Sequence, residues 1–399
     1  MSLKSDKRKN IKKNLSILSY NRLFTGIGYY LFVPLLSIIL LNIGLQPHIV
    51  GILVALFSFA TKGGGAISLI FPKCFIYEKR IISFGTLLAA IGLFSIFILH
   101  GSTVTISFLI FITGIGISLN LLSIQTYISN HVIENNKKFS SYTLQIWIAN
   151  VTAIAGPIIA NYLIKRFTTL PLFISGIFYL LAFLNTQLFF KSSINYNNYS
   201  RVNISQILKE IWNNHKFKLL LFISFLMWFI YGQLYFILPL YVKTTLHLSN
   251  ILGYLFGFNS LILVLLQGIV NRSLQRLGIT ENFRKNILVI GLGFLSIGLG
   301  FFLILMSSSL TFLVWLGIFF LSLGELLNMP LLDLNISNVR GHLTSPQFFA
   351  IYTIICGIGY GLSSLIFSYF TKYIHIGLII LVLLSIISFI ILNFYRNKI

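Results

Sequence analysis

Twelve long apolar stretches fill this chain almost from end to end, and no other feature constrains its fold as strongly. Each is long enough to cross the hydrocarbon core of a bilayer as a helix, which needs about 20 residues. A membrane β-barrel would instead show short segments of alternating polarity. Inside hydrocarbon every backbone polar group needs an internal partner, and a helix supplies that partner within each segment. The sequence therefore predicts an all-α integral membrane protein.

The polar connections divide the predicted spans into two sets. The spans, defined to within about four residues, cover 17–41, 48–71, 81–99, 103–128, 141–164, 169–190, 217–242, 250–271, 286–306, 310–331, 346–371 and 375–394. The longest polar connection separates six spans from six. We expect a basic tail at 1–16, a six-helix half at 17–190, a linker at 191–216 and a second six-helix half at 217–399.

The two sets of spans resemble each other in sequence. A shift of about 205 residues brings Tyr30–Leu35 onto Tyr235–Leu240 and Asn120–Leu122 onto Glu325–Leu327. Several matches at a nearly constant offset indicate a duplicated six-helix unit. Membrane proteins built from such repeats often bind a small molecule near the middle of the membrane, between the repeats.

The charge pattern indicates how the chain sits in a membrane. The formal net charge of +22 would suggest a nucleic-acid partner in a soluble protein. Here the basic residues gather in alternate loops, on the side of both termini, and the other side keeps Lys165, Arg166, Lys243 and Lys372. By the positive-inside rule, both termini are expected in the cytoplasm. We expect the protein to lie in the inner (plasma) membrane as a monomer, and we expect no nucleic-acid partner.

Enzymatic and metal-binding functions find no support in the sequence. Cys74 and Cys356 are far apart, and the seven histidines are scattered without the spacing of metal ligands. The sequence contains no Gly-rich phosphate-binding loop that ends in Lys-Ser or Lys-Thr. It also contains no cluster of an acid, a base and a nucleophile. We expect neither an enzyme nor a bound cofactor or metal.

Several short motifs resemble the major facilitator superfamily, and within it the drug and proton antiporter type. The residues that carry this resemblance are Arg22, Gly26, Gly28, Pro34, Gly51, Asn150 through Gly156–Pro157, and Gly324–Glu325 with Pro330. The resemblance covers all twelve spans and implies two six-helix bundles that rock around a central site. The chain departs from the pattern at Ala160–Asn161, where relatives have a Gly pair, and at Lys73, where they have an acid. Gln145 and Tyr235 stand where some proton-coupled relatives carry carboxylates.

Three charged side chains lie inside the predicted spans and more than one helical turn from the span ends: Arg22, Lys62 and Glu325. A carboxylate at membrane depth is costly unless it is paired or exchanges a proton, so Glu325 is the predicted proton-coupling residue. The alternative is a static carboxylate that serves helix packing. Arg22 and Lys62 are predicted to attract the transported molecule or to stabilise the ionised Glu325, or else to reach the membrane surface with their long side chains.

Uncharged polar and aromatic residues complete the predicted site. The residues predicted to bind substrate, besides Arg22 and Lys62, are Asn120, Gln145, Asn150, Tyr231, Tyr235, Asn328 and Tyr352. Small and helix-bending residues predict close packing or conformational change at Gly63, Gly64, Gly65, Gly156, Pro157 and Pro330.

The charges in the predicted spans indicate the class of cargo. Two cations and one acid favour an anionic or zwitterionic molecule. The expected function is proton-coupled export of a small metabolite or drug, with a polycarboxylate metal chelator (a siderophore) as the favoured cargo. Proton-coupled uptake of an anionic metabolite or chelator, broad multidrug efflux, and a membrane receptor without transport are the alternatives.

Overall fold

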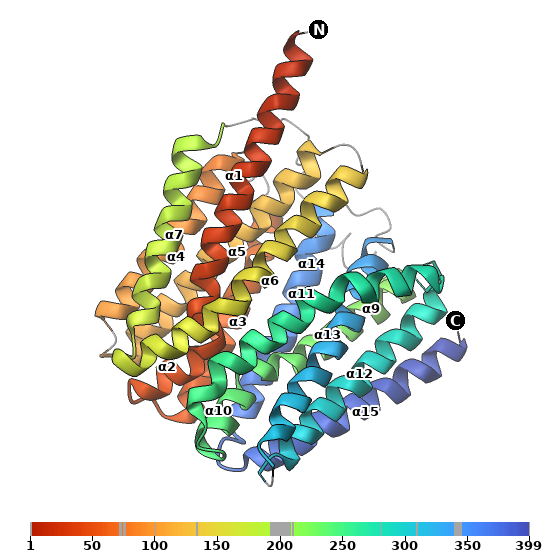
Figure 1. Ribbon diagram of the computed structural model, residues 1–399. Helices are drawn as coiled ribbons and strands as arrows, with labels where there is room; N and C mark the ends of the chain where they lie inside the picture. The colour runs from red at the N-terminus through yellow and green to blue at the C-terminus, as the bar shows by residue number, and fades with distance from the viewer. Residues whose placement is uncertain are drawn as a thin grey trace.

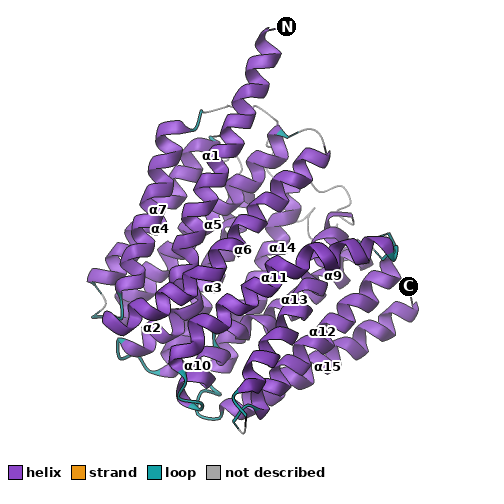
Figure 2. Cartoon of the chain, viewed as in Figure 1, coloured by secondary structure: helices purple, strands orange, loops and turns teal. Residues whose placement is uncertain are grey.

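The computed structural model describes residues 2–71, 74, 77–99, 101–132, 135–191, 209, 211–279, 281–308, 310–338 and 345–398. Within these residues the chain is helical and contains no strand (Figure 2). Twelve described segments are long and apolar enough to cross a membrane, and each overlaps one predicted span. The prediction of a twelve-helix membrane protein is confirmed. Most of the predicted linker, 191–216, lies outside the described residues.

The helices form two groups that diverge toward one end of the molecule (Figure 1). The N-terminal half contains α1 (Ser2–Phe32), η1 (Val33–Leu35), α2 (Leu36–Asn42), α3 (Pro47–Ile70), α4 (Glu78–Ile98), α5 (Thr103–His131), α6 (Asn135–Arg166) and α7 (Leu170–Phe189). The C-terminal half contains α9 (His215–Tyr231), η3 (Gly232–Tyr235), α10 (Ile237–Thr244), η4 (Ser249–Ile251), α11 (Leu252–Arg276), α12 (Phe283–Met306), α13 (Phe312–Asn338), α14 (Ser345–Ser368) and α15 (Ile374–Lys398).

Local sequence signals explain several helix ends and bends. Asn214 accepts a hydrogen bond from the backbone N–H of Phe217 at 3.1 Å and so caps α9, and Asn282 caps α12 in the same way. The first span of each half is interrupted by a 3-10 turn, η1 in one and η3 in the other. Pro157 lies inside α6 and Pro330 inside α13, which membrane helices tolerate because neighbouring helices satisfy the freed backbone groups.

Two long helix pairs hold the halves together. α3 packs along α14, and α6 packs along α11. Shorter contacts join η1 and α2 to η3, α10 and α11. Because an even number of spans returns the chain to its starting side, both termini lie at one face, which we call the termini face; the other is the opposite face.

The halves touch most closely at the opposite face, where glycines let backbones approach. A Cβ added to Gly51, at the start of α3, would lie 2.2 Å from Cβ of Ser368 at the end of α14. A Cβ added to Gly253, at the start of α11, would lie 2.4 Å from the carbonyl oxygen of Pro157. The opposite face is therefore closed in this conformation, and the halves diverge toward the termini face (Figure 1).

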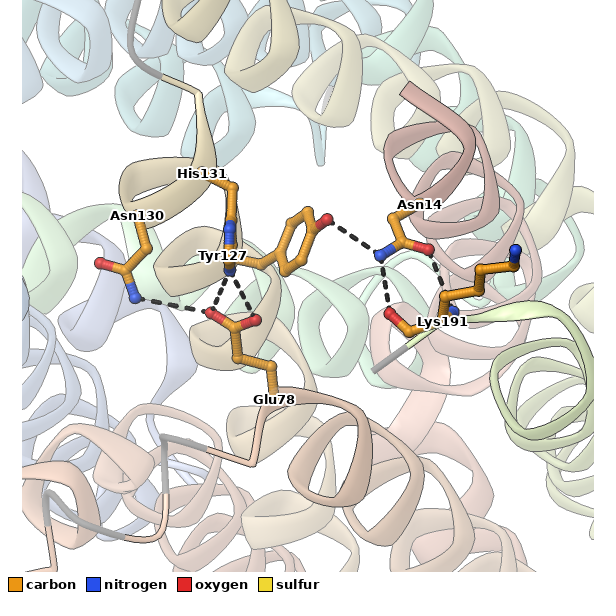
Figure 3. Close-up of polar contacts among 6 residues, drawn as sticks. All are labelled: Asn14, Glu78, Tyr127, Asn130, His131 and Lys191. Atoms are coloured by element: carbon orange, nitrogen blue, oxygen red, sulfur yellow. Dashed lines mark hydrogen bonds and ion pairs between the residues drawn. The ribbon is translucent and has the colours of Figure 1, made fainter. Parts of the chain in front are cut away.

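A buried polar cluster ties helices of the N-terminal half together at the termini face (Figure 3). His131 Nε2, at the end of α5, lies 2.9 Å from Glu78 Oε2, at the start of α4. Asn14 donates to the hydroxyl of Tyr127 at 3.0 Å and to the carbonyl of Lys191 at 2.9 Å, and accepts from the backbone N–H of Lys191 at 3.1 Å. The cluster thus fixes the chain where it leaves α7.

Candidate functional site

Glu325 is held by hydrogen-bond donors from its own half of the protein. It lies at the middle of α13, and the hydroxyl of Tyr231 on α9 donates to its Oε2. Asn259 on α11 donates to Oγ of Ser322 at 2.8 Å and lies 3.5 Å from the Tyr231 hydroxyl. We call these four residues the Glu325 cluster. Among the described residues, no Lys, Arg or His nitrogen lies within 4.0 Å of the Glu325 carboxylate.

Arg22 lies on the N-terminal half, where it contacts α6 rather than Glu325. Its Nε donates to the carbonyl oxygen of Gln145 at 3.4 Å, and the Gln145 amide donates to Oγ of Ser19 at 3.3 Å. Oε1 of Gln145 is buried and has no hydrogen-bond partner among the described residues. Arg22 and Gln145, each predicted to bind substrate, are thus brought together, and Gln145 keeps one buried acceptor without a partner among the described residues.

Lys62 crosses from one half to the other. It lies on α3, and its ammonium sits 4.2 Å from the centre of the Trp228 ring on α9. A cation over an aromatic face at this distance is attracted by the ring electrons. The base of the side chain is fixed, because a Cβ added to Gly357 on α14 would lie 2.6 Å from Cβ of Lys62. Lys62 therefore faces the C-terminal half and does not reach toward a membrane surface.

Asp333 is a fourth charged residue of the site and was not among the residues predicted from the sequence. It lies two turns beyond Glu325 on α13, inside a span that extends to Ile336 rather than to residue 331. Its Oδ1 accepts a hydrogen bond from the hydroxyl of Tyr352 on α14 at 2.9 Å, and it lies within electrostatic range of Lys62. Its side chain is nevertheless exposed. The expectation of two cations and one acid was wrong: with Asp333, the site contains two cations, Arg22 and Lys62, and two carboxylates.

Aromatic side chains surround these charges. Tyr235, in the 3-10 turn η3, stacks on Phe256 with ring centres 5.7 Å apart, and its ring lies 6.4 Å from that of Tyr360 on α14. The ring of Tyr360 lies 6.1 Å from that of Trp228. Tyr30, on α1, is within electrostatic range of both Arg22 and Glu325. Tyr30 is thus within range of a cation from the N-terminal half and of a carboxylate from the C-terminal half.

The three predicted asparagines connect helices and do not converge on Glu325. Asn120 is buried and donates to Oδ1 of Asn21 at 3.1 Å, which joins α5 to α1. Asn150 donates to Oε1 of Gln267 at 3.5 Å, from α6 to α11 across the halves. Asn328 donates to Sδ of Met227 at 3.3 Å, and its Oδ1 lies where a Cβ of Gly293 would stand.

The predicted glycines divide between close packing and open space. A Cβ on Gly65 would lie 2.8 Å from the carbonyl of Ala350 on α14, and one on Gly156 would lie 2.8 Å from Cβ of Tyr30 on α1. A Cβ on Gly63, next to Lys62, would meet nothing within 4 Å. The surroundings of Gly64 lie outside the part of the chain that the structure describes.

Besides the contact of Arg22 with Gln145, the structure brings predicted residues into two further groups rather than one site. Glu325 and Tyr231 lie together, with Asn259 added; Lys62 and Tyr352 lie near each other, with Trp228 and Asp333 added. Asn259 was not predicted as a site residue, although its position among the apolar residues of a span is a signal for one. Within the described residues, no group of three or more His, Cys, Asp or Glu side chains could hold a metal ion.

Comparisons with known proteins identify the fold. Residues 18–363 match the model of the Major Facilitator Superfamily. No curated protein matches the sequence. Among solved structures, a peptide transporter POT in complex with sulfate has a TM-score of 0.81 at 14% identity, with 98% of each chain covered.

Two further solved structures are similar along nearly their whole length. A POT family transporter in complex with 5-aminolevulinic acid has a TM-score of 0.78 at 14% identity, covering 96% of each chain. The nucleoside transporter NupG has a TM-score of 0.73 at 14% identity, covering 98% of this chain and 99% of that one. At these identities the likeness shows the fold alone.

Proposed function

Because the chain belongs to the major facilitator superfamily and is therefore a membrane transporter rather than an enzyme, we propose that it moves a small zwitterionic molecule in a proton-coupled cycle. The observation that carries this proposal is Asp333. With Arg22, Lys62 and Glu325 it makes two cations and two carboxylates among the helices. A cargo that carries one charge of each sign can pair with one cation and one carboxylate of this set.

The other cargo classes match the charges less well. A polycarboxylate chelator would set several negative charges against Asp333 and Glu325, and like charges in a poorly hydrated site are costly. A cationic drug would leave Arg22 and Lys62 without a partner. The solved POT family transporter in complex with 5-aminolevulinic acid holds a molecule with an amine and an acid group, which supports the zwitterionic class.

Glu325 is the proposed proton site. Tyr231 donates to its carboxylate, and no cation of the described residues pairs with it, so its charge is held by hydrogen bonds that a bound proton would rearrange. A residue that accepts and loses a proton at the middle of the membrane couples cargo movement to a proton gradient. In this proposal Glu325 exchanges the proton, and the charges of Arg22, Lys62 and Asp333 bind the cargo.

The termini face is the proposed cytoplasmic face of a plasma membrane. Basic residues gather at the described helix ends of this face, whereas Lys165, Arg166, Lys243 and Lys372 stand at the other. Export by antiport, which the resemblance to drug and proton antiporters implies, and uptake by symport use the same architecture. The direction of proton movement during cargo flux distinguishes the two.

The test uses purified protein in proteoliposomes loaded with a pH-sensitive dye. With 5-aminolevulinic acid as the probe and an imposed pH gradient, cargo should move against its concentration gradient, with protons moving alongside. Glu325→Gln should abolish gradient-driven accumulation and retain exchange of labelled for unlabelled probe, because a fixed neutral amide cannot cycle a proton. Glu281→Gln, in the exposed connection between α11 and α12, is the matched control.

Full accumulation by the Glu325→Gln variant would exclude Glu325 as the coupling residue. Equal accumulation of zwitterionic, purely anionic and purely cationic probes would exclude the zwitterionic cargo.

A further inference from the structure

The contact between Lys62 and Trp228 has the geometry of a bound ammonium ligand. An aromatic face, a nearby carboxylate and a phenol hydroxyl are the groups that hold primary and quaternary ammonium ions in binding sites. Trp228, Asp333 and Tyr352 provide these groups from α9, α13 and α14, all in the C-terminal half. The ammonium over the ring comes from the other half, on α3.

Asp333 keeps capacity for another partner. Tyr352 occupies one of its oxygens, and among the described residues no Lys, Arg or His nitrogen lies within 4.0 Å of its carboxylate. Its side chain is exposed although it lies within a span. Lys62 is in electrostatic range, yet its ammonium stays over Trp228. A carboxylate with an unfilled oxygen, within electrostatic range of an ammonium that lies over an aromatic face, is an incomplete cation site.

We infer that Trp228, Asp333 and Tyr352 form a subsite for the ammonium group of the cargo, and that Lys62 occupies it when no cargo is bound. This inference rests on the proposed function and names the part of the site that selects the cargo. An arriving ammonium displaces Lys62 from the ring and completes the coordination of Asp333. The displaced Lys62 then becomes the partner of the cargo carboxylate.

The anchoring of Lys62 supports this exchange. Its Cβ is held against Gly357, so the helix seam does not move when the ammonium does. Beyond that anchor three methylene groups carry the ammonium, and rotation about their bonds can move it. Next to it, Gly63 leaves space on α3 where a side chain would otherwise stand. A purely cationic cargo would leave Lys62 unpaired, and a purely anionic cargo would leave Asp333 unpaired, so a zwitterion satisfies both.

The experiment uses Trp228 as its own reporter. Replacing Trp147, Trp212 and Trp315 by Phe leaves Trp228 as the single tryptophan. The detergent-solubilised full-length reporter protein is titrated with tetramethylammonium chloride, and its fluorescence is recorded. Potassium acetate, which supplies an anion alone, is titrated in parallel. Tetramethylammonium should change the emission of Trp228, because a cation placed over the ring perturbs its excited state.

Removing the resident ammonium should strengthen binding of the probe. Lys62→Met keeps the length of the stem, and we expect it to bind tetramethylammonium about 10-fold more tightly than the parent reporter, as a freed cation–π site would. Lys62→Arg keeps a cation over the ring and should bind like the parent. Asp333→Asn, added to Lys62→Met, should weaken binding about 10-fold, the scale of one lost charge-assisted contact.

Lys243→Met is the matched control, because Lys243 also contacts the other half, donating to Asn42 at the opposite face, but lies away from Trp228. It should leave the affinity unchanged. The thermal unfolding temperature of every variant is compared with that of the parent. If Lys62→Met unfolds at a lower temperature, Lys62→Arg shows whether position 62 tolerates substitution. A Lys62→Met protein that binds the probe no more tightly, or an Asp333→Asn change without effect, would overturn the inference.

The two proposals fail in different ways. Absence of gradient-driven flux, with the binding pattern as expected, would remove the proton-coupled transport of zwitterions and leave the ammonium subsite. Flux of 5-aminolevulinic acid together with an unresponsive Trp228 would remove the subsite and leave the proposed function.

Discussion

Replacing Gly253 by alanine should shift the protein away from the conformation described above. Gly253 begins α11 at the opposite face, where it packs against α6. A Cβ there would lie 2.4 Å from the carbonyl oxygen of Pro157, 2.8 Å from Cβ of Asn161 and 2.9 Å from Cα of Ile158. Ordinary contacts begin near 3.4 Å, so α6 and α11 must separate by about 1 Å to admit one methyl group.

The expected size of the shift follows from the cost of overpacking. Forcing an extra methyl group into a well-packed contact costs about 1 to 3 kcal/mol. This cost applies where the opposite face is closed and is relieved when the halves separate there. The ratio of closed to open molecules should therefore fall by about 5- to 150-fold. Alanine also favours a helix over glycine by about 1 kcal/mol, which acts equally on both conformations.

The shift can be measured as a distance between the halves at the opposite face. Spin labels on cysteines that replace Phe167, after α6, and Ser249, before α11, report this distance by pulsed electron paramagnetic resonance. The background carries Cys74→Ser and Cys356→Ala. Gly268→Ala is the matched control, because it lies on the same helix and a Cβ there meets nothing within 4 Å.

A Gly253→Ala protein whose distance distribution equals that of the parent would refute the expected opening of the opposite face. The same expectation would be refuted by a Gly268→Ala protein that opens as far, because helix propensity would then explain both.

Two smaller changes test the interior contacts. Tyr231→Phe removes the donor to Glu325 and should lower proton-coupled accumulation of 5-aminolevulinic acid while exchange continues, so unaltered accumulation would speak against a role for this contact. Asn120→Leu leaves Oδ1 of buried Asn21 without its donor and should lower the free energy of unfolding by about 1 to 3 kcal/mol, measured by thermal denaturation in detergent. If Asn120 bound cargo instead, the same change would reduce probe affinity and leave the unfolding temperature unaltered.

Hydropathy was sufficient to predict the twelve spans because the bilayer permits few alternatives to a continuous apolar helix. It was less reliable at helix ends. The end of α13 is an example: the apolar run weakens near residue 331, although the helix continues to Asn338. Asp333 falls in that extension, where it gains a partner in Tyr352 on another helix. A contact with the next helix along the chain, α14, decided its place, and the hydropathy of its own span does not contain that information.

The rotational position of polar residues was the second limit. An amide avoids lipid whether it faces a ligand or another amide, so the sequence cannot separate the two cases. Asn120 turned out to bind Asn21, and Asn328 to lie against Gly293. The span that contains Glu325 was predicted from hydropathy, but the hydroxyl that donates to its carboxylate comes from Tyr231 on another helix.

Trp228 and Tyr231 are three residues apart on α9, and this spacing has a consequence for energy conversion. Residues three apart on a helix lie one turn from each other on the same side. One of them carries the ammonium of Lys62, and the other donates to Glu325. Both contacts are thus made by residues on adjacent turns of the same helix. A tilt or rotation of α9 that lengthens one contact must also change the other, without any relay of side chains between them.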